Sequence, residues 1–164
     1  MDDQLTHFDT KTGRAKMVNV GSKTETTRVA IARSLLKISP KLTAILAAGS
    51  LEKGDAFTVS KTAGILAAKQ TGFLIPMCHP LSVDYVAIDI ELLEDQNEVR
   101  IQAEAQTTAK TGVEMEAMVA VSVAGLTFYD MCKAVDKTIE ISRTGLWKKS
   151  GGKSGLFENP GMDW

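Results

Sequence analysis

Asp130 and Lys133 are the residues best suited to chemistry, because they lie three positions apart in a segment with helical character. Residues i and i+3 of a helix are neighbours on one face, and Lys137 would continue that face. A carboxylate held beside an ammonium group can take part in acid/base chemistry or bind a phosphate. The same spacing is typical of an ordinary surface ion pair, so the spacing alone leaves both interpretations open.

Two more carboxylates, Glu114 and Glu116, lie at the front of the same segment, which we expect to be helical from Thr111 to Lys137. Its centre, Ala117 to Tyr129, carries no charge. This centre is too short to cross a bilayer, so it predicts a helix buried on most sides. Glu116 and Asp130 are 14 residues apart, which is roughly 21 Å along a helix axis. The two ends therefore cannot share one small-molecule pocket unless a second subunit supplies one of them.

Two other segments carry side chains suited to proton transfer or recognition. Lys53, in Lys53-Gly54-Asp55, suits phosphate binding or acid/base work, although a solvated lysine before a capping aspartate fits this local pattern better. His79 is one of two histidines and lies in a loop restrained by Pro76 and Pro80. A restrained imidazole can bind a heterocycle or carry protons, and a turn histidine fits the pattern equally well.

The sequence lacks residues that a zinc site, a cysteine nucleophile and a Walker A loop would require. Cys78 beside His79 has no further ligands at the spacing of tetrahedral zinc, and no identifiable third group to orient a cysteine nucleophile. Gly152-Lys153-Ser154 imitates the end of a Walker A loop, but Trp147 stands where glycine is required. The segment Lys148–Gly155 instead suits a flexible cationic lid over an anionic substrate, or a frayed basic tail.

Composition indicates one globular domain in a reducing compartment. Of the 164 residues, 44% are apolar and 24% charged, and the net charge is −1, which argues against a general nucleic-acid or anionic-membrane binder. Two cysteines are too few for a disulfide scaffold, and no signal peptide is visible. We therefore expect a cytoplasmic protein with a flexible segment at 1–15, a single domain at 16–148 and a flexible Gly/Lys-rich tail at 149–164.

The pattern of elements predicts the fold. Alternating apolar residues in 86–93 and 99–106 predict a β-hairpin, and Ser39-Pro40 and Asp55 predict two helix starts, the second helix ending near Gly72. We expect strands at 28–38 and from Ile139 to about Trp147, and a short strand at 17–20. The order from residue 28 is that of an α+β, ferredoxin-like split βαβ sandwich, an antiparallel sheet with helices on one face.

Several blocks, in this order, resemble the molybdenum-cofactor biosynthesis protein C (MoaC) family. They are Lys53-Gly54-Asp55, Ala63-Gly64-Ile65 with Ala67-Ala68-Lys69, Ile75-Pro76-Met77-Cys78-His79-Pro80, Thr111-Gly112-Val113-Glu114-Met115-Glu116-Ala117, Tyr129-Asp130-Met131-Cys132-Lys133-Ala134-Val135-Asp136-Lys137 and Gly151-Gly152-Lys153-Ser154-Gly155. Together they span nearly the whole chain. Two departures stand out: Asn19-Val20-Gly21-Ser22-Lys23 replaces the usual Asp-Val-Ser-Gly-Lys, and Met77 replaces leucine.

The resemblance implies a cyclic pyranopterin monophosphate synthase, a phosphorus–oxygen lyase of molybdenum cofactor biosynthesis. Its substrate would be (8S)-3′,8-cyclo-7,8-dihydroguanosine 5′-triphosphate, and its products cyclic pyranopterin monophosphate and diphosphate. The family is ferredoxin-like and hexameric, a trimer of dimers with active sites at the dimer interface. No cofactor or metal is required, although Mg²⁺ on the substrate phosphates is chemically reasonable.

The resemblance also implies site residues by matching position. Asp130, Lys133 and Lys53 would serve catalysis, with Lys53 expected from the other chain. The remaining residues would bind the pterin end or the triphosphate: Met77, Cys78, His79, Glu114, Met115, Glu116, Arg28, Lys149 and Lys153.

Three alternatives to a synthase remain to be compared. A pterin or nucleotide carrier would bind in the same pocket without turnover. A ferredoxin-like RNA-binding module would need exposed aromatics on the sheet, whereas the hairpin's outward positions are charged or amide residues. A metal-dependent phosphohydrolase would lose its activity on chelation.

Overall fold

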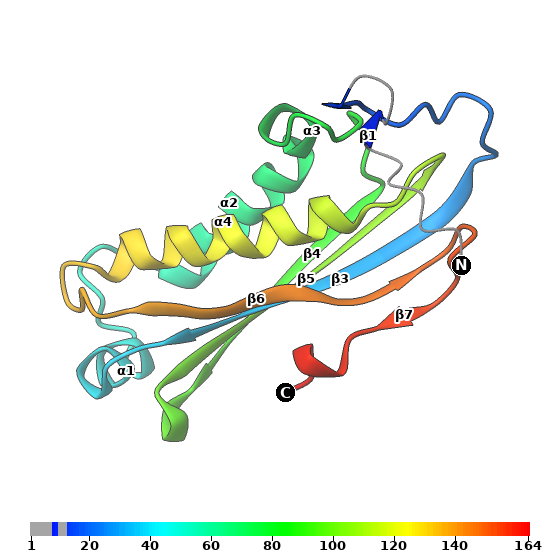
Figure 1. Cartoon of the computed structure of the whole chain (residues 1–164). Helices are drawn as coiled ribbons and strands as arrows, with labels where there is room; N and C mark the ends of the chain where they lie inside the picture. Colours follow the sequence, from blue (N-terminus) through cyan, green and yellow to red (C-terminus); the bar gives the residue numbers. More distant parts are fainter. Residues whose placement is uncertain (1–7, 10–12) are drawn as a thin grey trace.

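The computed structural model describes residues 8–9 and 13–164, and its main part is a five-stranded antiparallel sheet with helices packed on it (Figure 1). The spatial order of the five strands is β4-β5-β3-β6-β7. Their bounds are β3 Thr26–Lys37, β4 Tyr85–Leu93, β5 Glu98–Ala109, β6 Glu140–Ser150 and β7 Phe157–Glu158. A separate pair, β1 Phe8–Asp9 and β2 Arg14–Ala15, lies within the predicted N-terminal segment. The rest of that segment, residues 1–7 and 10–12, lies outside the described residues.

Four helices connect the strands, with bounds α1 Pro40–Ala47, α2 Ala56–Lys69, α3 Thr71–Leu74 and α4 Glu114–Cys132. The first three lie in the connection from β3 to β4, and α4 lies in the connection from β5 to β6. Two short 3₁₀ helices, η1 Glu94–Gln96 and η2 Pro160–Met162, complete the chain. The strands β3, β4, β5 and β6 with these connections confirm the predicted ferredoxin-like split βαβ fold, and α2 and α4 pack on one face of the sheet (Figure 1).

The central strand β3 was the ambiguous part of the sequence, and its two partners explain its conformation. It pairs along its length with β5 and β6, both antiparallel. Ala30, Ala32 and Leu36 are fully buried in the core that α4 covers. Intervening residues such as Arg33 therefore point to the opposite face, because successive side chains of a strand alternate. The predicted strand at 28–38 is confirmed.

Local capping fixes where the helices begin. The Ser39 side chain accepts a hydrogen bond from the Leu42 amide, with Pro40 at the first helical position. Asp55 accepts from the amides of Phe57 and Thr58 at the start of α2. Both predicted helix starts are confirmed, because each cap satisfies amides that the first turn leaves without partners.

Three expectations about element boundaries were wrong. The segment Met17–Val20 is not a strand. Gly72 does not end α2, which stops at Lys69; it lies in α3, where a Cβ would approach the Cα of Pro80 to 2.8 Å. Helix α4 ends at Cys132 with Lys133 as its cap, so Lys137 does not extend the face of Asp130. The chain turns after Lys133 because Asp136 accepts bonds from the amides of Ser39 and Thr138 instead.

Helix α4 is the core helix of the fold. It is long and apolar enough to span a membrane by length and composition, but it packs against α2 and four strands of the sheet, β3, β4, β5 and β6. Phe128, Ala120 and Ala124 are fully buried. Gly64 of α2 allows the two helices to approach, because a Cβ there would lie 2.8 Å from the Ala120 carbonyl oxygen. The prediction of a buried helix in a globular protein is confirmed.

The predicted hairpin, β4 and β5, and the predicted last strand, β6, are confirmed, and β6 is longer than expected. Val99, Ile101 and Ala103 alternate into the core, and Asn97 makes the turn in the left-handed region at φ 52°. Strand β6 continues past Trp147 to Ser150, and β7 pairs back onto it. The domain limits and the flexibility of residues 1–15 and 149–164 stay predictions.

Candidate active site

Asp130 joins two lysines at the C-terminal end of α4. Its carboxylate lies 2.6 Å from the Lys133 ammonium and 2.5 Å from that of Lys53. Lys53 also donates to the Asp130 carbonyl oxygen at 2.9 Å. Lys133 reaches the carboxylate as an i,i+3 neighbour, whereas Lys53 arrives from the loop between α1 and α2. The structure therefore assembles all three predicted catalytic residues into one cluster.

The expectation that Lys53 comes from the other chain was wrong for its contact with Asp130. The loop from Ser50 to Asp55 returns over the end of α4, since Leu51 packs on the core and Asp55 must begin α2. This path carries Lys53 to the end of its own chain's helix. One chain thus supplies the whole Lys53–Asp130–Lys133 cluster.

The cluster is exposed, and its ion pairs shift the pKa values of Asp130 and Lys133. Hydrogen bonds from Lys133 and then Lys53 lower the pKa of Asp130 to about 2. The same contact with Asp130 raises the pKa of Lys133. About half of each side chain is solvent-exposed (46%, 53% and 52% for Lys53, Asp130 and Lys133), so solvent screens these interactions. At neutral pH Asp130 is therefore ionised and a weak base, and Lys133 is protonated.

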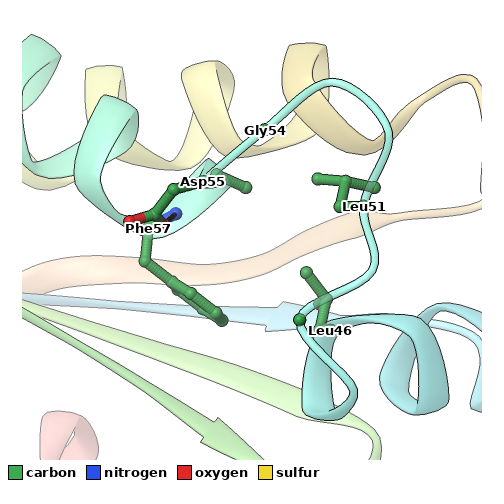
Figure 2. A pocket seen from close by; sticks show the side chains of 7 residues that line it. Leu46, Leu51, Gly54, Asp55 and Phe57 are labelled. Atoms are coloured by element: carbon green, nitrogen blue, oxygen red, sulfur yellow. Dashed lines mark hydrogen bonds between the residues drawn. The ribbon is translucent and has the colours of Figure 1, made fainter.

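Open space adjoins the cluster. A cavity of about 580 Å³ beside Lys53 is floored by apolar groups of α1, the loop and the end of α4. Its lining residues are Lys41, Ile45, Ser50, Leu51, Glu52, Lys53, Met131, Ala134 and Val135. A second cavity of about 300 Å³ lies on the other side of the same loop. Figure 2 shows it, with Leu46, Leu51 and Phe57 around it and Gly54 and Asp55 on the chain that leads into α2.

A second group of predicted residues gathers at the N-terminal end of α4. Lys149 of β6 forms an ion pair of 2.8 Å with Glu114. Glu116, two residues further along α4, is 3% exposed. Burial raises the pKa of Glu116 to about 6, and the charge of Glu114 adds to the rise. This end therefore offers a fixed cation beside a carboxyl group that can hold a proton near neutral pH.

The loop that carries Met77, Cys78 and His79 lies against this second group. Burial, and then the charge of Glu116, raises the pKa of the Cys78 thiol, so it is a poor nucleophile at neutral pH. The Nε2 atom of His79 lies 2.8 Å from the Val18 carbonyl oxygen. If the imidazole is neutral with Nε2 protonated, Nδ1 is its hydrogen-bond acceptor. Met115, in the first turn of α4, is partly exposed.

Arg28 and Lys153 complete the second group. The Arg28 guanidinium packs on Gly151 and Gly152, where a Cβ would collide with it or with the Thr27 carbonyl. Both glycines have positive φ, 96° and 69°, a region that favours glycine. Lys153 is exposed at the tip of this turn. The Nε of Arg28 is buried without a protein hydrogen-bond partner in the described chain.

The two groups lie at opposite ends of α4 and do not meet within one chain. Glu116 and Asp130 both lie in the continuous helix Glu114–Cys132, so the separation of roughly 21 Å holds. Sequence reasoning missed Val18, whose contribution is a backbone carbonyl, and the approach of Gly152 to Arg28. Neither feature depends on a local pattern, since each joins segments that are distant in the chain.

Metal ligation has no support among residues 8–9 and 13–164, where no group of three or more His, Cys, Asp or Glu side chains is arranged to hold an ion. Cys78 is half-buried and Cys132 is buried, and both are free.

Comparison with known proteins gives one consistent result. The MoaC family model matches residues 17–152, which is most of the chain. A cyclic pyranopterin monophosphate synthase of Clostridium perfringens is 51% identical over 96% of this chain and 99% of its own length. A protein of the same name from Roseiflexus castenholzii is 52% identical over 92% of this chain and 95% of its own. Another, from Listeria monocytogenes, is 50% identical over 95% and 96%. On this similarity and this fold, the chain belongs to the MoaC family.

Proposed function

We propose that the chain is a cyclic pyranopterin monophosphate synthase acting on (8S)-3′,8-cyclo-7,8-dihydroguanosine 5′-triphosphate. The observation that carries the proposal is Asp130 bridging Lys53 and Lys133 beside an open cavity, in a chain about half identical to relatives of that name. The enzyme would be a lyase. A ribose hydroxyl would attack the α-phosphorus and lose its proton to solvent water, the bond from the α-phosphorus to the oxygen that bridges it to the β-phosphorus would break, and diphosphate would leave as the cyclic monophosphate forms.

The electrostatics of the cluster suggest separate roles for its members. Lys133, which the contact with Asp130 keeps protonated at neutral pH, would hold the proton that is donated as the guanine-derived ring opens. Asp130, with a pKa of about 2, would hold the two ammonium groups rather than accept protons. Lys53 would supply the second cation, next to the cavity.

We further propose that a complete site combines the two ends of α4 from different subunits. Arg28, Lys149 and Lys153 would neutralise the triphosphate, and the loop at Met77–His79 with Glu114–Glu116 would contact the pterin end. The separation of the ends within one chain supports an interface site. A homohexamer built as a trimer of dimers would supply such interfaces.

The proposed chemistry uses protons and fixed cations, so no metal or cofactor is required. Mg²⁺ on the substrate phosphates would assist diphosphate departure without being held by the protein. Turnover should therefore persist, at a changed rate at most, after treatment with EDTA. We expect the protein to act in the cytoplasm, in keeping with α4 being a core helix.

Diphosphate release from the cyclic triphosphate tests this function. Lys133→Ala should abolish release with an unchanged circular dichroism spectrum. Lys137→Ala is the matched control, because Lys137 is an exposed lysine outside the cluster. Equal release from wild type and Lys133→Ala would keep the enzyme but overturn the assignment of Lys133. Tight binding by wild type without release would favour a carrier.

A further inference from the structure

The last residues of the chain form a strap on the sheet, here defined as residues 157–164. It begins with β7, which pairs with β6 through Lys148–Glu158 and Lys149–Phe157. Figure 1 shows it on the side of β6 away from α4. A strand of two residues gives little stability on its own, so other contacts must hold the strap in place.

Arg33 supplies a buried contact, and Arg143 also donates to the Gly161 carbonyl at 3.1 Å. Arg33 points from β3 to the face opposite α4, and only 6% of it is exposed. Its guanidinium carbon lies 3.1 Å from the ring centroid of Trp147 and 4.4 Å from that of Trp164. It donates to the Met162 carbonyl at 2.9 Å and to the Asp163 carboxylate at 3.1 Å. One planar cation thus joins the sheet to the strap by stacking and by hydrogen bonds.

A bulge in β6 makes this arrangement possible. Ile31 pairs with Lys148 and Ala32 with Leu146, which leaves Trp147 as the extra residue. A bulge redirects side chains and frees backbone groups. Asn159 binds the freed groups. Its backbone amide donates to the Trp147 carbonyl at 2.8 Å, and its side-chain amide donates to the Leu146 carbonyl at 3.3 Å.

The strap determines the position of the cationic turn at 151–156. This turn leaves β6 after Ser150 and re-enters the sheet at Phe157, so it is closed at both ends. Lys153 lies at its tip, and Gly152 packs on Arg28. Release of the strap would leave the turn joined to the sheet at one end only.

We propose that Arg33, stacked between Trp147 and Trp164, is a positioning residue that holds the strap and thereby presents Arg28, Lys149 and Lys153 to the phosphates. This inference rests on the proposed function for its substrate. Arg33 touches no phosphate in this scheme and acts through the turn. Loss of the clamp should weaken substrate binding and leave the distant Lys53–Asp130–Lys133 cluster unchanged.

Trp164→Ala is the sharpest test, because it removes one side of the clamp without burying a new group. We expect KM to rise about tenfold, which is the order of one desolvated cation–π contact, with kcat within about twofold of wild type. Affinity for inorganic triphosphate, measured by calorimetry, should fall by a similar factor. Hydrogen exchange at Asn159 should become faster.

Two further variants sharpen the result. Leu156→Ala is the control, since Leu156 is 74% exposed on the same turn and belongs to no clamp contact. Arg33→Lys keeps the charge but loses the planar stack, and it should reproduce Trp164→Ala. Unchanged exchange and unchanged KM in Trp164→Ala would overturn the clamp. Faster exchange with unchanged KM, or a fall in kcat alone, would overturn its role in positioning.

These readouts keep the two proposals apart. If wild type releases no diphosphate, the proposed function fails. Hydrogen exchange at Asn159 and the affinity for inorganic triphosphate then still decide whether the clamp positions an anion-binding turn. Equal triphosphate affinity in wild type and Trp164→Ala would then refute it.

Discussion

At the scale of single residues, the contacts of Asp130 make the proton-donor role of Lys133 testable by pH. Asp130→Asn removes the charge that raises the pKa of Lys133, so that pKa should fall. Lys133 still holds its proton near neutral pH in this variant, so the rate lost through its deprotonation should grow only as the pH rises toward that lowered pKa. In a profile of kcat/KM against pH, the alkaline limb should move to lower pH. An alkaline limb that stays in place would exclude Lys133 as the acid.

Glu116 gives a second prediction at this scale, concerning stability. Its folded pKa, about 6, lies above the ordinary value of 4.5, so the folded state binds the proton more tightly than the unfolded state. The resulting stability is present below pH 4.5 and is lost as pH rises through 6. Relative to wild type, the free energy of unfolding of Glu116→Gln should therefore be about 1–2 kcal/mol higher at pH 7 than at pH 4.5. Urea unfolding at pH 4.5 and pH 7 measures this difference, and Glu91→Gln, at an exposed position of β4, is the control. A difference between Glu116→Gln and wild type that is equal at the two pH values would contradict the prediction.

At the scale of elements, two glycines in the helix pair should respond oppositely to alanine. Gly64 faces α4 so closely that a Cβ would lie 2.8 Å from the Ala120 carbonyl oxygen and would overlap Ile88. Gly64→Ala should destabilise by about 1–3 kcal/mol through forced separation of the helices. Gly125 has its nearest neighbour at 3.5 Å, so Gly125→Ala should be neutral or gain up to about 1 kcal/mol from helix propensity. Thermal unfolding of both variants distinguishes them, and equal shifts would contradict this packing.

The elements were predictable wherever a local pattern was sufficient. Alternation at Val99, Ile101 and Ala103 and the caps at Ser39 and Asp55 depend on neighbouring residues, and these elements are confirmed. The strap was beyond prediction, because its clamp joins Arg33 to Trp164 across most of the chain. The contact of Lys53 with its own chain was missed for the same reason, since the path of a loop depends on the packing of both its ends.

At the scale of the whole molecule, the division of the site residues between the two ends of α4 allows the interface to be tested directly. If one chain gives the Lys133 end and its neighbour the Lys149 end, two different defects can complement each other. Lys133→Ala and Lys149→Ala chains should each be inactive alone. Random mixing after co-refolding should leave about a quarter of the sites with both lysines intact, because each end is drawn independently with a probability of about one half. Diphosphate release near a quarter of the wild-type rate is therefore expected. A mixture that stays inactive, although native mass spectrometry shows mixed oligomers, would place both ends at a site within one chain and would contradict the separation along α4.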